Sequence, residues 1–389
     1  MRYRADMHES NDGSVMPDWE ALRVQFPVTR NYIYFNHAAI APISQKVQEQ
    51  VSSCMQKYCE YGIVCNREFL DIVEDTRRLA AQFINAHPSE IAFVKNTTQG
   101  LLLAANGIEW KRGDNVVIPE REFPANVFPW LALERRGVEV RFAPLINGTY
   151  TLDNIRRVVN ERTRAISVSA VSFIDGFRCN LAEIGRFCKE REIFFVVDAI
   201  QALGAVDVDV KGCHIDLLSA DSHKWLLGPQ GIGIAYVSKN ALDALTVSNM
   251  GWMSMTEESD HLRYDIRLRP CAARFEEGTL NIFGIVGLKA ALEMLSGIGL
   301  PAIYDRILEL TDSLVTGLTE RGYEVRSSMK LSERSGIVSF THVQLPVKDI
   351  YRKLYERNVV CALRDNAIRI SPHFYNNGND INRFLDILC

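Results

Sequence analysis

The sequence predicts an α/β fold: a large domain with a mostly parallel, seven-stranded sheet, followed by a small α+β C-terminal domain. Two observations support this fold class. From about residue 90, short runs of strand-forming residues alternate with longer helical patterns, which is typical of βαβ units. The runs are continuously apolar instead of alternating between apolar and polar residues, as expected for strands that helices cover on both faces.

The seven expected strands follow one another between residues 90 and 237. In chain order they are "EIAFV" (90–94), "NVVIP" (115–119), "VEVRFAP" (138–144), "RAISVSAV" (164–171), "IFFVVDA" (193–199), "IDLLSA" (215–220) and "GIGIAYV" (231–237). Helical patterns such as "TQGLLLAANGI" and "LAEIGRFCKERE" separate them. This alternation is the reason to expect a parallel sheet.

The pattern changes after residue 237. A stretch without regular periodicity, 238–280, precedes two amphipathic helical patterns, "IVGLKAALEMLSGIG" and "YDRILELTDSLVTGLTERG". The tail has two expected strands, "IVSFTHV" and "AIRISPHFYN", and two expected helices, "DIYRKLYERN" and "DINRFLDIL". Because 389 residues are many for a single core, we expect three parts, namely an N-terminal segment (1–30), a large cofactor-binding domain (31–265) and a small C-terminal domain (266–389).

Composition and charge argue against several classes of function. Lys and Arg total 44 against 48 Asp and Glu, and no basic stripe is interleaved with aromatic residues, so we expect no nucleic-acid partner. The polar N-terminus lacks the core of a secretory signal and no long apolar stretch follows, so we expect a cytoplasmic protein with no membrane partner. The nine scattered cysteines include no C-x-x-C pair, so we expect neither a disulfide framework nor a metal site.

Polar and aromatic residues gather directly after four of the expected strands. Ligands of open α/β sheets bind at the carboxyl ends of the strands, so these residues are site candidates. They are Thr97 and Thr98 after the first strand, Phe123 after the second, Asp198 and Gln201 after the fifth, and Asp221, His223 and Lys224 after the sixth. Singly, most are explained by helix capping or by an exposed loop. Together they provide the groups that a pyridoxal 5′-phosphate site needs.

Two of these residues would take part in the chemistry of that cofactor. Lys224 would bond to the cofactor, because burial and nearby positive charge lower the pKa of a lysine and leave a nucleophilic amine near neutral pH. Asp198 would keep the ring nitrogen protonated, and the resulting positive charge would make the ring an electron sink.

The remaining residues would hold the cofactor in place. Thr97 and Thr98 open a helix, where unpaired backbone N–H groups and two hydroxyls could bind the phosphate. Gln201 could donate a hydrogen bond to the ring hydroxyl. Phe123 could stack on the ring face, although core packing explains this residue equally well. A phosphate-binding P-loop motif is absent from the sequence, which argues against a nucleotide as the ligand.

Four segments resemble the motif series of the class V aminotransferase-fold enzymes: "VVDAIQALG", "SADSHKWLLGPQGIGIAYV", "RFEEGTLN" and "AIRISPHFYN". This family includes cysteine desulfurases, selenocysteine lyases, isopenicillin N epimerases and kynureninases. The resemblance extends from about "NYIYFNHAAIAP" to the C-terminus. It implies a pyridoxal phosphate type I fold and a homodimer with its sites at the subunit interface.

The resemblance also implies roles for single residues. Asp221 and His223 match ligands on the phosphate side, and Thr279 in "EEGTLN" matches the residue that reaches the phosphate of the partner subunit. Arg369 in "AIRIS" matches the arginine that binds the substrate carboxylate. Strand alternation agrees, because the two isoleucines beside Arg369 would face the small-domain core and the arginine would face the opposite way.

The sequence departs from the cysteine desulfurases in the segment that carries their nucleophilic cysteine. Only four residues separate Arg364 from Arg369, so the loop is short, and Cys361 lies on a strand-like apolar run where we expect it to be buried. "EFPAN" replaces the histidine that covers the ring in those enzymes. Phe173 takes the place of an asparagine near the ring oxygen.

These observations predict an enzyme that removes the α-proton of an amino acid, with Lys224 as both the cofactor-bonded residue and the proton carrier. We expect a reaction of the epimerase or lyase type and not a persulfide-forming cysteine desulfurase. The alternatives are an aminotransferase, a cysteine desulfurase or selenocysteine lyase, and, from another class, a non-catalytic regulator that binds the cofactor. His37 and Arg178 are further candidates for the substrate side, without an assigned role.

Overall fold

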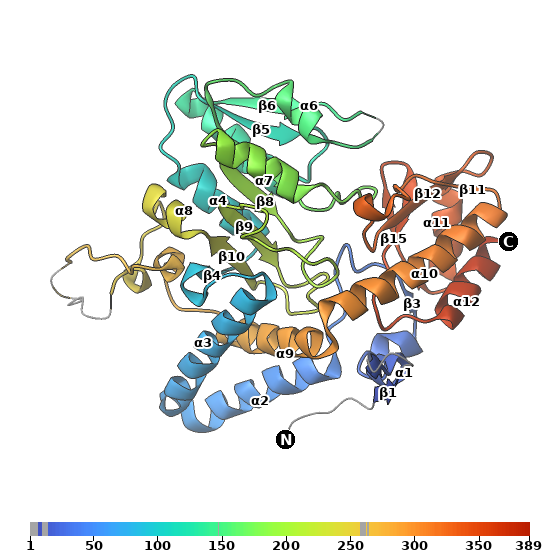
Figure 1. Ribbon diagram of the computed structural model, residues 1–389. Coiled ribbons are helices and arrows are strands. Elements are labelled where there is room, and N and C mark those ends of the chain that lie inside the picture. The colour runs from blue at the N-terminus through green and yellow to red at the C-terminus, as the bar shows by residue number, and fades with distance from the viewer. Residues whose placement is uncertain (1–6, 10–14, 147, 257–261, 263) are drawn as a thin grey trace.

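A seven-stranded sheet forms the centre of the molecule (Figure 1). The structure is a computed structural model that describes residues 7–9, 15–146, 148–256, 262 and 264–389. In sheet order the strands are β4 (Ile91–Val94), β10 (Gly233–Val237), β9 (Leu217–Asp221), β8 (Phe194–Asp198), β7 (Thr163–Ser169), β5 (Asn115–Pro119) and β6 (Glu139–Ala143). β10 runs antiparallel to both of its neighbours, and all other pairs are parallel. The seven expected strands and the mostly parallel sheet are therefore confirmed.

Helices cover both faces of this sheet. Alternate side chains of each strand point to opposite faces, so a continuously apolar strand presents apolar side chains on both of them. In β5, Val116 and Ile118 lie in one apolar cluster and Val117 lies in the other. The first cluster contains side chains of α4 (Thr97–Gly107), α5 (Phe128–Leu131) and α8 (Lys239–Ala244), and the second those of α6 (Leu152–Arg156) and α7 (Leu181–Glu190). Each fully buried valine or isoleucine stabilises the fold by about 1.5–3 kcal/mol, which explains why the strands are continuously apolar.

Three long helices pack together beside the β4 edge of the sheet (Figure 1). They are α2 (Gln45–Tyr61), α3 (Asn66–Phe83) and α9 (Ile282–Ile298). Phe69, Val73 and Ala80 recur at helical spacing on α3 and are buried, so this face of the helix is held against its neighbours. α9 thus lies with the large sheet, and the predicted domain division at residues 265 and 266 stays a prediction.

The C-terminal part is an antiparallel sheet covered by helices. The strand order is β11 (Tyr323–Val325), β12 (Val338–His342), β15 (Ala367–Ile370) and β14 (Ala362–Arg364). Helices α10 (Leu300–Glu320), α11 (Val347–Glu356) and α12 (Gly378–Leu388) accompany it, in orange and red in Figure 1. The small α+β unit is confirmed, with two strands, β11 and β14, beyond those expected. Each has only three residues, which is too short for an apolar periodicity to reveal.

The N-terminal segment lies against this small unit. Strand β3 (Ile33–Tyr34) pairs in parallel with β13 (Val359–Val360). Helix α1 (Trp19–Arg23) and the pair β1 (Met7–Glu9) and β2 (Val15–Pro17) precede it, whereas residues 1–6 and 10–14 of the predicted segment 1–30 lie outside the described residues. Within the described part of the chain, no single helix is long and apolar enough to cross a membrane; α9 and α10 satisfy the length and composition only as a pair bent by 80°.

Candidate active site

A cavity of about 430 Å³ lies where β8 and β9 end. Residues of the seven-stranded sheet and of the four-stranded C-terminal sheet line it. Nine of the ten predicted site residues line this cavity, namely Thr97, Thr98, Phe123, Asp198, Gln201, Asp221, His223, Lys224 and Arg369. Thr279 does not; it is exposed in the connection between the 3₁₀ helix Ala272–Phe275 and α9. The cavity also includes residues to which the sequence assigned no role, above all Phe173 and Arg364.

The residues after β9 form a tight turn that places Lys224. The backbone N–H of Leu227 donates to the carbonyl oxygen of Lys224 at 3.0 Å, and that of Gly228 donates to the carbonyl oxygen of Ser222 at 2.9 Å. Leu227 has a φ of 58°, a left-handed conformation that costs a branched residue about 1–2 kcal/mol. Side-chain burial offsets this cost, because Leu227 is completely buried. The turn therefore fixes the backbone on both sides of the lysine.

Close packing behind the turn requires a glycine at position 204. Gly204 has a φ of 103°, and a Cβ atom added there would lie 2.1 Å from the carbonyl oxygen of Trp225. Trp225 is fully buried, and its Nε1 donates to Oε1 of Gln201 at 2.9 Å. The other end of the Gln201 amide donates to the carbonyl oxygen of Ala38. One N–H of Gln201 remains for the predicted bond to a ring hydroxyl.

Lys224 is 7% exposed, and its pKa is lowered to about 8. Burial is the main cause; Asp198 opposes it, and the positive charge of Arg369 adds to it. Nζ lies 5.5 Å from the centroid of the Phe123 ring. At pH 7 about a tenth of such amines carry no proton, against about one in 2,500 for an ordinary lysine. The amine can therefore act as a nucleophile near neutral pH.

Asp198 ends β8 with a carboxylate that is almost completely buried. Burial raises its pKa to about 6, while a hydrogen bond from the backbone N–H of Ile200 at 3.0 Å and the charge of Lys224 lower it. Such a carboxylate gains free energy from a cationic partner. A protonated ring nitrogen is such a partner, so the predicted role of Asp198 fits its setting.

The residues at the start of α4 and after β9 offer the cavity further hydrogen-bonding groups, and the Thr97 hydroxyl accepts from the backbone N–H of Asp221 at 3.0 Å. Asn96 caps α4 by accepting from the backbone N–H of Gln99, which leaves Thr97 and Thr98 in the first turn. His223 Nδ1 lies 3.0 Å from Oδ1 of Asp221, but the two atoms lack hydrogen-bond geometry, and neither has a hydrogen-bond partner among the described residues. A free imidazole nitrogen beside a helix N-terminus suits a phosphate. The residues present therefore fit both the ring and the phosphate of pyridoxal phosphate.

Arg369 projects from β15 into the cavity, while its neighbours Ile368 and Ile370 are fully buried in the small-unit core. The predicted alternation is confirmed. The side chain is 2% exposed; Nη1 donates to the carbonyl oxygen of Phe173 at 2.5 Å, and Nε has no partner among the described residues. Burial, together with the charge of Arg364, lowers its pKa to about 9. A carboxylate partner would offset the cost of burying this guanidinium, so the predicted role of Arg369 fits its setting.

The two aromatic residues of the cavity contact each other. The rings of Phe123 and Phe173 meet edge to face, with centroids 5.2 Å apart. Phe123 is 41% exposed, so its face is open to a ligand as well as to its neighbour. Arg178 lies outside this cavity; its guanidinium stacks over Tyr304, 5.7 Å from the ring centroid, beside a different cavity.

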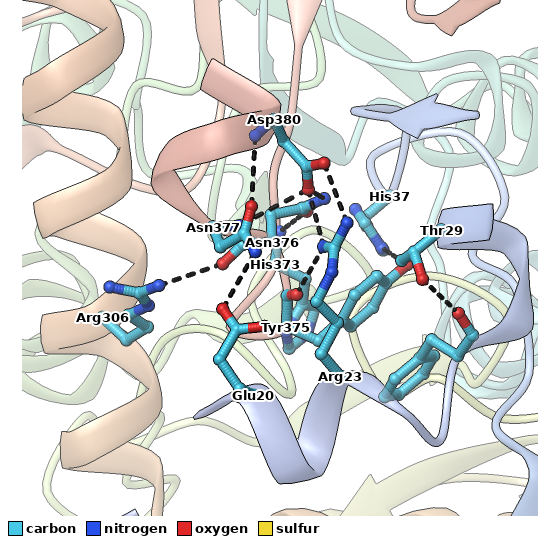
Figure 2. Close-up of polar contacts among 11 residues, drawn as sticks. Glu20, Arg23, Thr29, His37, Arg306, His373, Tyr375, Asn376, Asn377 and Asp380 are labelled. Carbon is cyan, nitrogen blue, oxygen red and sulfur yellow. Dashed lines mark hydrogen bonds and ion pairs between the residues drawn. The ribbon is translucent and has the colours of Figure 1, made fainter. Parts of the chain in front are cut away.

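His37 belongs to a buried polar network that joins the N-terminal segment to the small unit (Figure 2). Its Nδ1 donates to the carbonyl oxygen of Ser371 at 2.7 Å, and Nε2 accepts from the hydroxyl of Tyr375 at 2.6 Å. Arg23 of α1 pairs with both carboxylate oxygens of Asp380 on α12, at 2.7 and 2.9 Å. His37 therefore supports the wall of the cavity, formed by the adjacent Ala38, and does not line the cavity itself.

Acid should destabilise the protein partly through His37. Burial lowers the pKa of His37 to about 4, from an ordinary value near 6.5. Between these two values the unfolded chain binds a proton that the folded protein does not, so the free energy of unfolding falls as the pH decreases from about 6.5 to about 4. We expect His37→Gln to lose this component, which is on the order of 3 kcal/mol.

Urea unfolding of the wild type and of His37→Gln at pH 7, 5.5 and 4.5 measures this component. Burial raises the pKa values of Asp198 and Glu122, which changes stability in the opposite sense in both proteins. The difference between the two profiles therefore reports His37 together with its charge coupling to His373, whose pKa is lowered by burial and by His37. His87→Gln, at an exposed histidine, is the matched control. Parallel profiles for the wild type and His37→Gln would contradict the expectation.

Comparison with known proteins identifies the family. The family model for class V aminotransferases matches residues 33–384. The chain belongs to the class V aminotransferase family. It is 29% identical to a probable cysteine desulfurase of Methanothermobacter thermautotrophicus, over 93% of this chain and 95% of the relative. It is 32% identical to a cysteine desulfurase of an Enterobacter species, over 73% of each protein. The solved apo structure of a cysteine desulfurase from Thermococcus onnurineus superposes with a TM-score of 0.86 at 26% identity, covering 99% of this chain and 98% of that one.

Membership of the class V aminotransferase family confirms the resemblance found in the sequence. It also confirms the type I fold, the prediction of an enzyme, and pyridoxal 5′-phosphate as the cofactor. The roles of the single site residues stay predictions.

The predicted reaction type was wrong. The sequence favoured an epimerase or lyase and argued against a persulfide-forming cysteine desulfurase, whereas near full-length relatives are named cysteine desulfurases. The observations behind the argument hold: two left-handed residues, Asp365 and Asn366, join β14 to β15, and burial raises the pKa of the Cys361 thiol to about 12. These two observations concern the position of one thiol only. They do not determine which bond of the substrate breaks. They also do not determine which thiol accepts the sulfur.

Proposed function

We propose that this protein is a pyridoxal phosphate-dependent cysteine desulfurase that removes sulfur from L-cysteine or a closely related sulfur amino acid. One observation carries the proposal. A lysine with a lowered pKa and an arginine that no carboxylate of the described residues pairs with, both buried, lie in one cavity of a chain whose relatives are named cysteine desulfurases. The first group suits bonding to the cofactor, and the second suits the α-carboxylate of an amino acid.

Each side chain then has a physical task. Arg369 binds the α-carboxylate, which orients the α-hydrogen toward the amine of Lys224. Lys224 accepts this proton and returns it to carbon, as its pKa near 8 permits. The bound cofactor supplies an electron sink, which Asp198 maintains by keeping the ring nitrogen protonated. Phe123 and Phe173 give one side of the cavity an apolar surface against which the ring of the cofactor could pack.

The overall reaction transfers one sulfur atom to a thiol. L-Cysteine and an acceptor thiol R–SH give L-alanine and the persulfide R–S–SH, so the Cβ–S bond breaks, an S–S bond forms, and no external oxidant or reductant is consumed. Cys361 is buried with a pKa of about 12, so the thiolate form that would attack sulfur is scarce there. An added thiol such as dithiothreitol is therefore the acceptor to use in an assay.

The test is incubation of the cofactor-loaded protein with L-cysteine and dithiothreitol, with alanine and sulfide quantified. The second thiol of dithiothreitol then attacks the inner sulfur of the dithiothreitol persulfide, which releases sulfide and closes the dithiothreitol disulfide, so alanine and sulfide should form in equal amounts. Formation of pyruvate and ammonia in place of alanine would indicate elimination, and transfer of the amino group to a keto acid would indicate an aminotransferase. Either result would overturn the proposal.

We further propose that the protein acts as a homodimer in the cytoplasm and that Thr279 reaches the phosphate site of the partner subunit. The exposed position of Thr279, away from the cavity of its own chain, supports this arrangement. Exposed apolar side chains, including Ile63 and Val64 between α2 and α3 and Trp252 beside Gly278, are also consistent with a covering subunit.

A further inference from the structure

Four consecutive carbonyl oxygens, those of residues 222–225, accept hydrogen bonds that fix the turn around Lys224. The first and the third accept from backbone N–H groups of the turn itself. The second accepts from the backbone N–H of Ala41 at 2.8 Å. The fourth, that of Trp225, accepts from His373 Nε2 at 3.1 Å, and within the described part of the chain it accepts no other hydrogen bond. A side chain of the small unit therefore holds the residue that directly follows the lysine.

The hydrogen bonds of His373 determine which of its ring nitrogens carries the proton. The backbone N–H of Phe374 donates to Nδ1 at 2.8 Å, so Nδ1 is an acceptor and the proton lies on Nε2. The ring is completely buried. Burial and the neighbouring His37 lower the pKa of His373 well below its ordinary value, although the bond to Trp225 opposes them. The imidazole is therefore neutral, and its one N–H is used on the Trp225 carbonyl.

The backbone around His373 is held in place as well. Its N–H donates to Oδ1 of Asn376 at 2.9 Å, and its carbonyl oxygen accepts from the backbone N–H of Asn376 at 2.9 Å. The amide of Asn376 donates in turn to Oδ2 of Asp380 on α12 at 3.0 Å (Figure 2). Only residues 370–372 separate His373 from Arg369 on β15. A short connection with fixed ends therefore joins the strand of Arg369 to the turn that holds the lysine.

This connection matters because its two ends act on one small molecule. Arg369 would hold the α-carboxylate, and Lys224 would take the proton from the adjacent carbon. The distance between the two groups must therefore be held closely, since a misplacement of about 1 Å can lower a rate by about 100-fold. The bond from His373 to Trp225 fixes that distance directly across the two parts of the molecule.

We propose that His373 is a positioning residue that sets the place of the Lys224 amine relative to Arg369 by donating to the carbonyl oxygen of Trp225. His373 belongs to the segment "AIRISPHFYN", in which the sequence assigned a role to the arginine alone. It does not line the cavity and acts through the lysine. The inference rests on the proposed roles of Lys224 and Arg369, and it is independent of the fate of the substrate's sulfur atom.

Competition with a small free amine measures how well Lys224 is placed. Methylamine, added to the cofactor-loaded protein, competes for the covalent bond to the cofactor, and borohydride followed by mass spectrometry gives the fraction that stays on the lysine. The methylamine concentration that displaces half of the cofactor is proportional to the effective concentration of the Lys224 amine. We expect this concentration to fall about tenfold in His373→Asn, because the shorter amide replaces Nδ1 and does not reach the Trp225 carbonyl.

Two further variants separate the hydrogen bond from general loosening. In His373→Gln the amide nitrogen takes the place of Nε2, so most of the wild-type value should return. Tyr375→Phe is the matched control, because it also removes one buried hydrogen bond of this segment, that to His37, but keeps the bond to Trp225. It should lower the melting temperature without changing the displacement by methylamine. Equal displacement in the wild type and His373→Asn, or equal losses in His373→Asn and either other variant, would overturn the proposal.

Steady-state kinetics distinguish this role from that of Arg369. With L-cysteine as the substrate, His373→Asn should lower kcat by about 10- to 100-fold and leave KM nearly unchanged, because the carboxylate site is intact. A raised KM at unchanged kcat would overturn the proposal, since His373 would then act on Arg369 only. Failure of the wild type to form alanine would overturn the desulfurase proposal alone, because displacement by methylamine needs no substrate and still tests His373.

Discussion

Replacing Lys224 with alanine should lower the rate of alanine formation from L-cysteine by about a thousandfold or more, since removal of a positioned acid–base group costs up to about four orders of magnitude. The same change should abolish covalent attachment of the cofactor. In the wild type, borohydride reduction should fix the cofactor on the peptide that contains Lys224. Mass spectrometry of the digested protein measures this directly.

The size of the effect follows from the surroundings of the amine. The tight turn that ends at Gly228 fixes the backbone of Lys224, and burial lowers the side-chain pKa to about 8. No second lysine lines the cavity in the described part of the chain, so none can replace it as a proton carrier. Loss of this one amine should therefore remove both the attachment and the proton transfer.

Lys348→Ala is the matched control, because Lys348 is exposed on α11 and does not line the cavity. It should keep both activity and labelling. Labelling of another lysine in the wild type, or undiminished turnover in Lys224→Ala, would exclude Lys224 as the catalytic amine.

The strand ends predicted which residues share one cavity because of a simple property of parallel sheets. The carboxyl ends of β8 and β9 lie side by side, so residues that follow them, such as Asp198 and Lys224, meet in space although 26 residues of sequence numbering (224 − 198) separate them. The apolar runs themselves predicted the strands, since burial on both faces leaves little room for polar residues.

Other parts of the site depend on pairings that no local pattern reveals. Recognition of Arg364 as a cavity residue requires the register of the β14–β15 hairpin, in which one strand has only three residues. His37 meets Ser371 across 334 positions of sequence, so its role in supporting the wall appears only in the folded chain. The apolar run around Cys361 correctly predicted the burial of this thiol. Neither that burial nor the short hairpin loop determines the reaction type, which depends on the cofactor and on the substrate.

Replacing Arg369 with lysine should raise the KM for the amino acid substrate and lower kcat/KM by about 10- to 100-fold, which corresponds to the loss of about 1.5–3 kcal/mol of charge-assisted hydrogen bonding. Lysine retains the positive charge but offers a point charge in place of the planar fork that binds both carboxylate oxygens. Cofactor binding should be unchanged, because the predicted phosphate and ring contacts lie elsewhere in the cavity.

A methionine at the same position separates a binding role from a structural one. The buried guanidinium of Arg369 has an unpartnered Nε and a pKa lowered to about 9, so it destabilises the ligand-free protein relative to an apolar side chain of similar size. Arg369→Met should therefore have a melting temperature equal to or above that of the wild type, while its kcat/KM falls at least as far as that of Arg369→Lys.

Calorimetry of the ligand-free proteins and steady-state kinetics measure the two quantities, with Arg352→Met on the exposed face of α11 as the control. A drop in melting temperature together with retained kcat/KM would show that Arg369 supports the fold and does not bind the substrate. A residue that binds the substrate at a cost in stability should give the opposite result, namely a stable protein with low activity when it is replaced.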